Sequence, residues 1–382
     1  MSSVEEFRTE VRSWLRAHLT GGFAALKGRG GPGREHEAFT ERLAWERHMA
    51  AHGWTCLGWP VEYGGRGASV EEQIAFHEEY ALADAPARVN HIGEQLLGPT
   101  LIAHGTEEQK RRFLPPIRAV EELWCQGYSE PDAGSDLAGV RTRAALHHGQ
   151  WVIDGQKTWT SLARQAQWCF VIARTEPGSR RHAGLSYLLV PMDQPGVEVR
   201  PIVQLTGTSE FNEVFFDGAR TDAAHVVGAP GDGWNIAMAT LGYERGVSTL
   251  GQQVGFRREL ETLAALARRN GALADPLIRD RLVRAWIGLE TMRATALRPA
   301  AAPSMAKLYW ARWHRDLGEL AMDVCGAASL LAAGAHGDPY DLDDSQRLFL
   351  FSRADTVYAG SDEIQRTLIA ERILGLPKEV RA

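Results

Sequence analysis

The 382-residue sequence has few cysteines and no long hydrophobic run. Its four cysteines lie far apart and form no CxxC pair, so the sequence indicates neither a structural zinc site nor a disulfide framework. No stretch approaches the roughly 18 to 20 apolar residues that span a bilayer, and the charged, amphipathic start lacks the apolar run of a signal peptide. We therefore expect a soluble, cytoplasmic protein with reduced thiols and without a bound metal.

The sequence also lacks a strong excess of either charge. Its formal net charge of −6 gives no general attraction to nucleic acid or to an anionic membrane. With 44% hydrophobic and 24% charged residues, the composition is that of a globular protein, which excludes a disordered, collagen-like or coiled-coil chain. The length predicts two or three domains.

Three stretches of different hydrophobic periodicity divide the chain. Residues 1–120 show the 3.6-residue spacing of helices, most clearly in 5–19 and 40–53. Residues 121–230 show short runs typical of strands, and residues 231–382 return to helical periodicity. We therefore predict an α+β multidomain protein in which a β-sandwich or barrel domain stands between two α-helical domains with these boundaries.

The middle stretch contains several predicted strands. Asp154-Gly155 predicts the turn of a hairpin between 151–154 and 156–160. Further strands are predicted over 168–173, 185–191, 197–205 and 211–216. The Gly-rich stretch 21–33 lacks the GxxxxGK[ST] spacing of a phosphate-binding loop and follows a helix, so we expect a plain surface loop there.

In the last stretch, capping and breaking residues predict where helices end. Asn270-Gly271 and Arg298-Pro299 predict interruptions. Long helices are predicted over 304–333, 345–358 and 361–374.

One segment, residues 124–139, collects Ser, Gly and Asp at a transition from helix to strand. Backbone N–H groups that become available at such a transition can bind anions. A tight turn that needs small residues explains the same composition. The residues alone leave the two interpretations equal.

A second segment, residues 232–246, places a carboxylate on a helix face of small residues. The residues that share this face with Glu244 are Ala237, Thr240, Leu241, Val247, Ser248 and Gly251. Small neighbours leave room for a ligand, and an apolar environment moves a carboxyl group toward the working range of a general base. An ion pair between Glu244 and an arginine on a solvated surface is the equally weighted alternative.

Four blocks of the chain resemble the signatures of the acyl-CoA dehydrogenase family. They are GYSEPDAGSDLAG at 127–139, GQKTWTS at 155–161, FNEVFF at 211–216 and AGSDEIQR at 359–366. The blocks follow the family's order and spacing, and the resemblance extends over essentially the whole chain. It implies an N-terminal α-helical domain, a middle β domain and a C-terminal four-helix bundle, in agreement with the periodicity.

The resemblance implies an FAD-dependent oxidoreductase that removes two hydrogens across Cα–Cβ of an acyl-CoA thioester. In such enzymes a base takes the α proton while the β hydrogen leaves as hydride to the flavin. The thioester carbonyl needs hydrogen-bond donors that strengthen as enolate character develops. The resemblance also implies a homo-oligomer, a dimer or tetramer, that passes electrons to an electron-transfer flavoprotein or a similar acceptor.

The resemblance further implies which residues form the site. The implied flavin contacts are Gln126, Gly127, Tyr128, Ser129, Trp159, Thr160, Ser161, Ser361 and Glu363. The implied substrate contacts are Ser135, Tyr243, Arg245, Ala359 and Gly360.

The position of the base departs from the commonest family pattern. Many members carry their catalytic glutamate directly after the tyrosine that matches Tyr358, where this chain has Ala359. The isovaleryl and long-chain branches place the base on the first helix of the C-terminal domain, before an arginine, which matches Glu244 and Arg245 here. We therefore expect Glu244 to be the base, the backbone N–H of Ala359 to contact the thioester oxygen, and the acyl group to be branched or bulky.

A second departure concerns the adenine end of FAD. Relatives hold it across a subunit interface with an arginine, a Phe-Gly pair and a glutamine before two glycines. Here ARRNG at 267–271 lacks Phe-Gly and MDVCG at 322–326 lacks the glutamine. Three alternatives to the homo-oligomeric enzyme therefore stay open: a subunit of a heteromeric dehydrogenase of the steroid side-chain type, a non-catalytic structural partner subunit, and a flavin oxidase or monooxygenase on the same fold.

Overall fold

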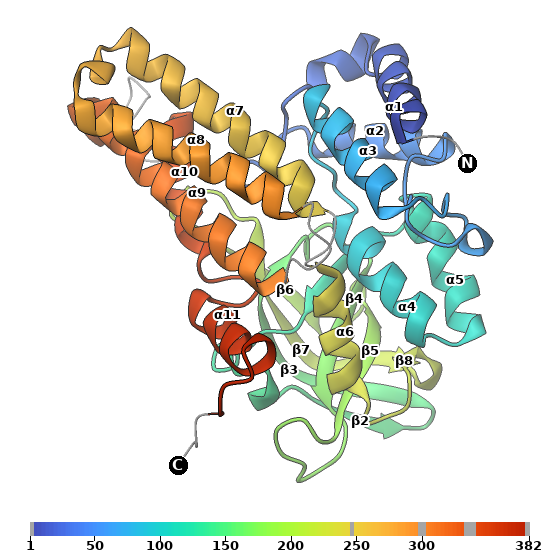
Figure 1. Ribbon diagram of the computed structural model, residues 1–382. Coiled ribbons are helices and arrows are strands. Elements are labelled where there is room, and N and C mark those ends of the chain that lie inside the picture. Colours follow the sequence, from blue (N-terminus) through green and yellow to red (C-terminus); the bar gives the residue numbers. More distant parts are fainter. Residues whose placement is uncertain (1–3, 245–247, 297–302, 332–340, 379–382) are drawn as a thin grey trace. The chain divides into compact units, whose positions relative to one another are not determined.

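A computed structural model describes residues 4–244, 248–296, 303–331 and 341–378 (Figure 1). For Glu244, residues 248–251 and Ala296 it describes the backbone only. The described residues fall into two compact units. The first is drawn from Met1–Gln73, Ala83–Gln204 and Thr208–Glu244, and the second from Ile74–Leu82, Leu205–Gly207 and Arg245–Ala382. Within the described ranges, no helix combines the length and the apolar content needed to cross a membrane.

The first unit begins with helices, as the periodicity predicted. They are α1 (Val4–His18), α2 (Phe39–Ala51), the start of α3 (Val70–Leu82), the π-helix η3 (Ile92–Leu97), α4 (Gly98–His104) and α5 (Glu107–Arg118). Helix α1 buries Phe7, Val11 and Leu15, which recur every four residues on one face. Helix α5 begins with a capping box, in which Thr106 and Gln109 each bond the other's backbone N–H.

The middle of the first unit is one connected eight-stranded sheet, which confirms the predicted β domain. Its strands are β1 (Trp124–Gly127), β2 (Arg143–His147), β3 (Gln150–Ser161), β4 (Trp168–Arg174), β5 (Leu185–Pro191), β6 (Val197–Ile202), β7 (Phe211–Asp222) and β8 (Val226–Val227). Their order is β6-β7-β3-β2-β4-β5-β8, with β1 paired to β4. Strands β5 and β7 are distant in this order, yet the Thr221 hydroxyl donates to the Leu189 carbonyl at 2.5 Å. The sheet therefore folds over on itself, as in a sandwich or barrel.

The hairpin predicted at Asp154-Gly155 is wrong. Strand β3 runs straight through these residues, and Gly155 pairs with Phe216 of β7. A Cβ on Gly155 would lie 2.4 Å from the Thr142 hydroxyl, so this glycine serves a close approach and not a turn. The turn lies at His148-Gly149, whose φ angles of 49° and 81° match the two left-handed positions of a tight hairpin.

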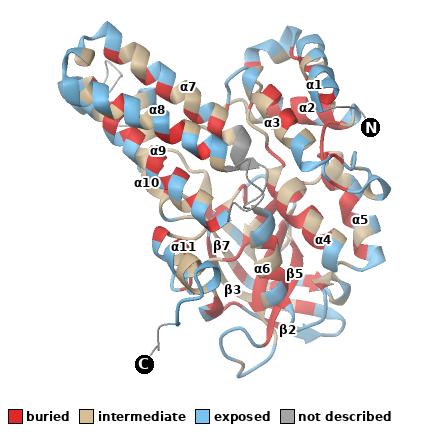
Figure 2. Ribbon diagram, in the orientation of Figure 1, coloured by how far each residue is buried: buried red, intermediate tan, exposed pale blue. Residues whose placement is uncertain are grey.

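The second unit contains a helical bundle. Its helices are α7 (Ser248–Arg269), α8 (Pro276–Ala296), α9 (Pro303–Cys325) and α10 (Asp344–Asp355), followed by α11 (Asp362–Leu368) and the π-helix η8 (Ile369–Ile373). Helix α9 packs on α7, α8 and α10, and their inward faces are buried (Figure 2). The helix predicted over 304–333 ends early, because Gly326 takes a left-handed φ of 60° and starts a short 3₁₀ turn. The predicted interruption at Arg298-Pro299 lies outside the described residues.

Candidate active site

In the first unit, the sheet brings two predicted flavin-contacting segments together. Gln126–Ser129 covers the last two residues of β1 and the two residues after it, and Trp159–Ser161 forms the end of β3. The Thr158 N–H donates to the Ser129 carbonyl at 2.9 Å and joins them. A side chain on Gly127 would come within 2.9 Å of the Cys169 sulfur, so close packing requires glycine there. Ser135 follows in an exposed loop.

A buried ion pair between Lys157 and Glu130 connects these two segments. The Lys157 ammonium contacts the Glu130 carboxylate at 2.8 Å and donates to the Tyr128 carbonyl at 3.0 Å. Glu130 also accepts the N–H groups of Arg141 and Thr142 at 2.6 and 2.9 Å. Burial lowers the pKa of Lys157 against the opposing effect of Glu130. Burial alone would raise the pKa of Glu130, but Lys157 and the hydrogen bonds bring it below its usual range.

The end of β3 presents an aromatic ring and a hydroxyl group in an arrangement that suits a ligand. An irregularity in the β3–β7 pairing between Lys157 and Thr160 bulges the strand, and Trp159 within it has a φ of 59°. Its side chain is 58% exposed, edge-on to Phe211. The Thr160 hydroxyl next to it is buried and finds no partner within the described part of the chain. A strained, exposed tryptophan beside an unsatisfied hydroxyl favours a bound planar polar molecule.

Tyr128 is held differently from its neighbours. Its ring packs edge-on against Phe170 and Tyr187 in the core of the first unit. Its carbonyl is bonded to Lys157. The aromatic side chain therefore serves the core.

Helix α6 (Gly233–Glu244) carries the predicted base at its last residue. Tyr243 before it is 38% exposed. Ala237 and Thr240, predicted to leave room for a ligand, are fully buried, and the Thr240 hydroxyl lies 2.8 Å from that of Thr100 on α4. At these two positions the small side chains serve close packing of α6, so that part of the prediction is wrong. Arg245 lies outside the described residues.

The second unit holds the remaining predicted residues in a loop and a helix start. Ala359 and Gly360 have left-handed φ angles of 52° and 86°, and the buried Gln365 amide donates to both of their carbonyls, at 3.1 and 3.2 Å. No acceptor in the described ranges is bonded to the Ala359 N–H. Ser361 caps α11 by accepting the Ile364 N–H. The exposed Glu363 has a lowered pKa because of its own backbone N–H and the Ser361 hydroxyl.

A second buried network of hydrogen bonds lies next to this loop and is joined to it through Tyr358. His314 of α9 contacts Asp355 of α10 at 2.5 Å and Glu259 of α7 at 2.9 Å. Burial alone would lower the pKa of His314, but the two carboxylates raise it to about 9. Asp355 also accepts the Tyr358 hydroxyl at 2.6 Å, and its carbonyl accepts the Lys307 ammonium. Three helices and the residue before Ala359 thus meet at one cation.

Sequence reasoning missed the residues that support the site. Lys157 and Glu130 carried a usable signal, because they lie inside two of the family-like blocks and lysine is rare in this chain. His314 carried none, since its partners Asp355 and Glu259 are 41 and 55 positions away along the chain. Gln365 lay inside the last block, but nothing in the sequence showed where its amide points.

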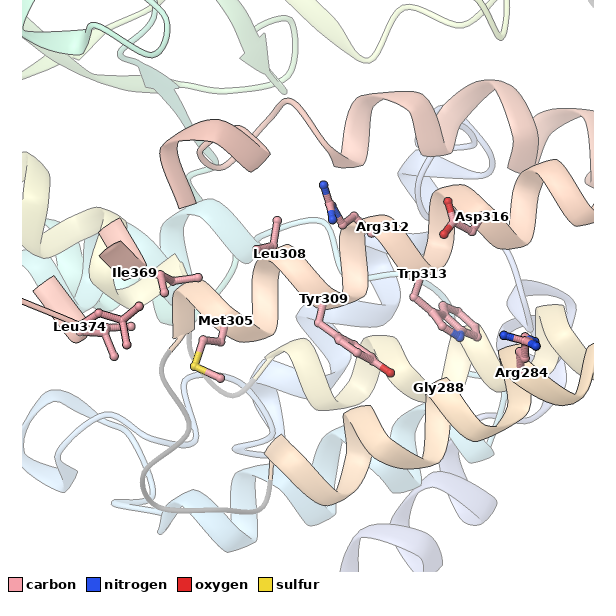
Figure 3. Close-up of a pocket in the computed structure, with 11 residues that line it drawn as sticks. Arg284, Gly288, Met305, Leu308, Tyr309, Arg312, Trp313, Asp316, Ile369 and Leu374 are labelled. Carbon is pink, nitrogen blue, oxygen red and sulfur yellow. The ribbon is translucent and has the colours of Figure 1, made fainter. Parts of the chain in front are cut away.

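The bundle also has a pocket of its own. Figure 3 shows it along α9, next to α8 and η8. Its lining residues are Arg284, Gly288, Met305, Leu308, Tyr309, Arg312, Trp313, Asp316, Ile369, Ile373 and Leu374. None of them belongs to the predicted site.

The described chain thus runs from a helical stretch, through a folded-over sheet with an exposed tryptophan near the end of β3, to a helical bundle. Family models of acyl-CoA dehydrogenase match the chain in all three parts: the N-terminal domain at residues 2–121, the middle domain at 125–219 and the C-terminal domain at 231–374. The chain belongs to the acyl-CoA dehydrogenase family.

Individual relatives agree with this assignment. The chain is 65% identical to acyl-CoA dehydrogenase IpdE1 of Mycobacterium tuberculosis, over the full length of both. It is 30% identical to a chain of the steroid ACAD Tcur3481-Tcur3483, with a TM-score of 0.83 over 98% of each chain. It is 29% identical to a chain of the ChsE4-ChsE5 complex of M. tuberculosis, with a TM-score of 0.81 over 99% of each.

Proposed function

We propose that this chain is an FAD-dependent acyl-CoA dehydrogenase that desaturates the Cα–Cβ bond of an acyl-CoA thioester, with Glu244 as the general base. The observation that supports it best is the bulged end of β3, where the exposed Trp159 ring adjoins the unsatisfied hydroxyl of Thr160. A flavin ring offers a flat face for the indole and polar edge atoms for the hydroxyl, so these residues fit the cofactor.

The proposed flavin contacts are the nine residues that the family resemblance implies. Gln126–Ser129 and Trp159–Ser161 would hold the ring, and Ser361 and Glu363 are further proposed contacts. When bound, FAD would accept the β hydrogen of the substrate as hydride. The buried Lys157–Glu130 pair fixes the backbone that carries the first two segments and so positions them.

The proposed chemistry of the protein groups is proton removal and charge stabilisation. Glu244 would take the α proton. The N–H of Ala359, which has no acceptor within the described chain, would donate to the thioester oxygen as negative charge develops there. Ser135, Tyr243, Arg245 and Gly360 are proposed substrate contacts, with an electron-transfer flavoprotein or a similar protein as acceptor.

The test of the base is Glu244→Gln, which keeps shape and hydrogen bonding but cannot take up the α proton. We expect anaerobic flavin reduction by a good acyl-CoA to slow by a factor on the order of 10² to 10⁴, while binding of the acyl-CoA persists. Glu261→Gln, at an exposed position on α7, is the matched control and should reduce the flavin normally. An undiminished rate in Glu244→Gln would show that another group is the base.

A second variant tests the geometry of the base. Adding Ala359→Glu to Glu244→Gln returns a carboxylate to the position that many relatives use. Ala359 already has a left-handed φ of 52°, so a glutamate meets the same backbone strain that alanine meets. We expect part of the lost activity to return.

A heteromeric dehydrogenase is the second candidate function. Two relatives favour it. One is the steroid ACAD Tcur3481-Tcur3483, whose name joins two proteins, and the other is the ChsE4-ChsE5 complex. In addition, Asn270 lies in the segment that corresponds to the adenine-binding residues of relatives. Its side chain donates to the Val324 carbonyl at 2.7 Å and so forms a contact within the bundle. The acyl group would then be a bulky ring system, which agrees with the branched or bulky acyl group expected from the position of the base.

Light scattering and flavin absorbance, with and without a coexpressed homologue from a neighbouring gene, separate the two assemblies. A yellow homo-oligomer that turns over acyl-CoA alone would support the first candidate. A chain that becomes yellow only with the homologue would support the second. Absence of flavin under both conditions would contradict the cofactor assignment.

A further inference from the structure

Three histidines of the first unit gather where two helices end. His18 is the last residue of α1, and His48 and His52 lie four residues apart at the end of α2. One ring nitrogen from each histidine can be chosen so that all three lie within 4.8 Å of one another. The His18 Nδ1 and His48 Nε2 atoms are 2.8 Å apart. None of these residues belongs to the proposed active site.

The spacing of the three rings suits a single small cation. Imidazole nitrogens bind zinc at about 2.0–2.1 Å, which puts two ligands of one tetrahedral ion roughly 3.3 Å apart. The nitrogen separations here, from 2.8 to at most 4.8 Å, bracket that value. Two histidines at i and i+4 on one helix, with a third from a neighbouring helix, supply three ligands and leave one position for water.

The surroundings hold the rings in a form that can bind a metal. The His52 Nδ1 atom lies 2.8 Å from the His48 carbonyl, which can only accept, so this contact favours the tautomer with the proton on Nδ1 and directs Nε2 to a metal ion. The Trp14 ring stacks on His18 with 4.5 Å between centroids, and Phe23 packs beside His48. These contacts fix the ring orientations before any ion arrives.

Burial and crowding lower the pKa of two of the three rings. Burial lowers the pKa of His18, and the neighbouring His52 lowers it further. Burial likewise lowers the pKa of His48, followed by the effects of His52 and His18. Three imidazole rings whose nitrogens lie this close together can share one divalent ion as ligands.

We propose that His18, His48 and His52 form a binding site for a divalent first-row transition metal, which clasps the end of α1 to the end of α2. This revises the sequence-based expectation of no metal, which rested on cysteine spacing and overlooked histidines 30 residues apart. Zn²⁺ is the commonest ion for such a ligand set, and Co²⁺ is a spectroscopic substitute for it. The clasp is a structural site, independent of the proposed dehydrogenase activity.

The test is titration of the full, untagged and chelator-treated protein with Zn²⁺ by calorimetry and with Co²⁺ by visible absorbance. We expect one equivalent of Zn²⁺ to bind and to raise the unfolding temperature, and Co²⁺ to give the visible bands of a four-coordinate site. His52→Gln, at an exposed position, and His18→Gln should each weaken Zn²⁺ binding on the order of tenfold or more.

His36→Gln, an exposed histidine of the same unit outside the cluster, is the matched control and should bind as the wild type does. Circular dichroism of each variant shows whether it is folded, so that a folding defect is distinguished from the loss of a metal ligand. The proposal is overturned if the wild type binds neither ion, or if His18→Gln and His52→Gln bind as well as His36→Gln does. The second result would mean adventitious surface binding only.

Discussion

The sheet of the first unit and the bundle of the second each contain a buried basic side chain next to a predicted site segment. These side chains are Lys157 in the sheet and His314 in the bundle, and their partners are arranged differently. In the sheet, Lys157 pairs with one carboxylate, and that carboxylate holds backbone N–H groups of the next segment. In the bundle, His314 lies between two carboxylates from two other helices, and the site loop is attached through Tyr358.

The difference follows from what each scaffold lacks. At the bulged end of β3, regular pairing with β7 is interrupted after Lys157, and the lysine side chain ties this end of the strand to the Tyr128 carbonyl and the Glu130 carboxylate. Helices satisfy their own backbone groups, so the bundle needs side chains only to link one helix to another. A histidine suffices for that, and it makes the link sensitive to pH.

Removing the lysine should have the largest effect. Lys157→Met leaves the Glu130 carboxylate buried without its cation, which typically costs about 3–5 kcal/mol of folding free energy. We expect a matching loss of stability in chemical denaturation, together with loss of the flavin that we propose binds above this pair. Arg143→Met, which breaks an exposed pair with Asp154 on the same sheet, should cost less than about 1 kcal/mol. Equal effects of the two changes would refute the role given to the buried pair.

The contribution of His314 to the free energy of unfolding should depend on pH. The folded-state pKa of His314 is raised from 6.5 to about 9, so its stabilisation is complete below pH 6.5 and is lost as the pH rises through 9. The full contribution is on the order of 3 kcal/mol. We expect the stability gap between wild type and His314→Gln to shrink between pH 6 and pH 10 in thermal unfolding. A constant gap, or the same shrinkage with the exposed His104→Gln, would contradict this.

The smallest effect is expected at the loop itself. Gln365→Leu removes the two hydrogen bonds that hold the Ala359 and Gly360 carbonyls, at a cost of about 1–3 kcal/mol. The exposed Thr367→Ala on the same helix should change stability by less than about 0.5 kcal/mol. Hydrogen exchange around residue 359 would locate the change. If exchange rises equally in both variants, Gln365 does not anchor the loop.

Local patterns predicted most of the elements and failed where distant partners intervene. The helix periodicity placed α1 and α2, and strand β5 appeared at the predicted residues. The Asp154-Gly155 turn failed because Phe216 of β7, 61 positions along the chain from Gly155, pairs with it. The small face of α6 predicts room for a ligand, but Thr240 on this face packs against Thr100 of α4.

The sequence by itself determined the family, the three-part order and the identity of the candidate site residues, because these depend on ordered motifs and short-range periodicity. Only the tertiary structure decided that Trp159 is exposed beside an unsatisfied hydroxyl, and that His314 lies between Asp355 and Glu259. It also decided that His18, His48 and His52 meet. Burial and charge pairing depend on residues that are far apart along the chain, and no local pattern records which of them will come together.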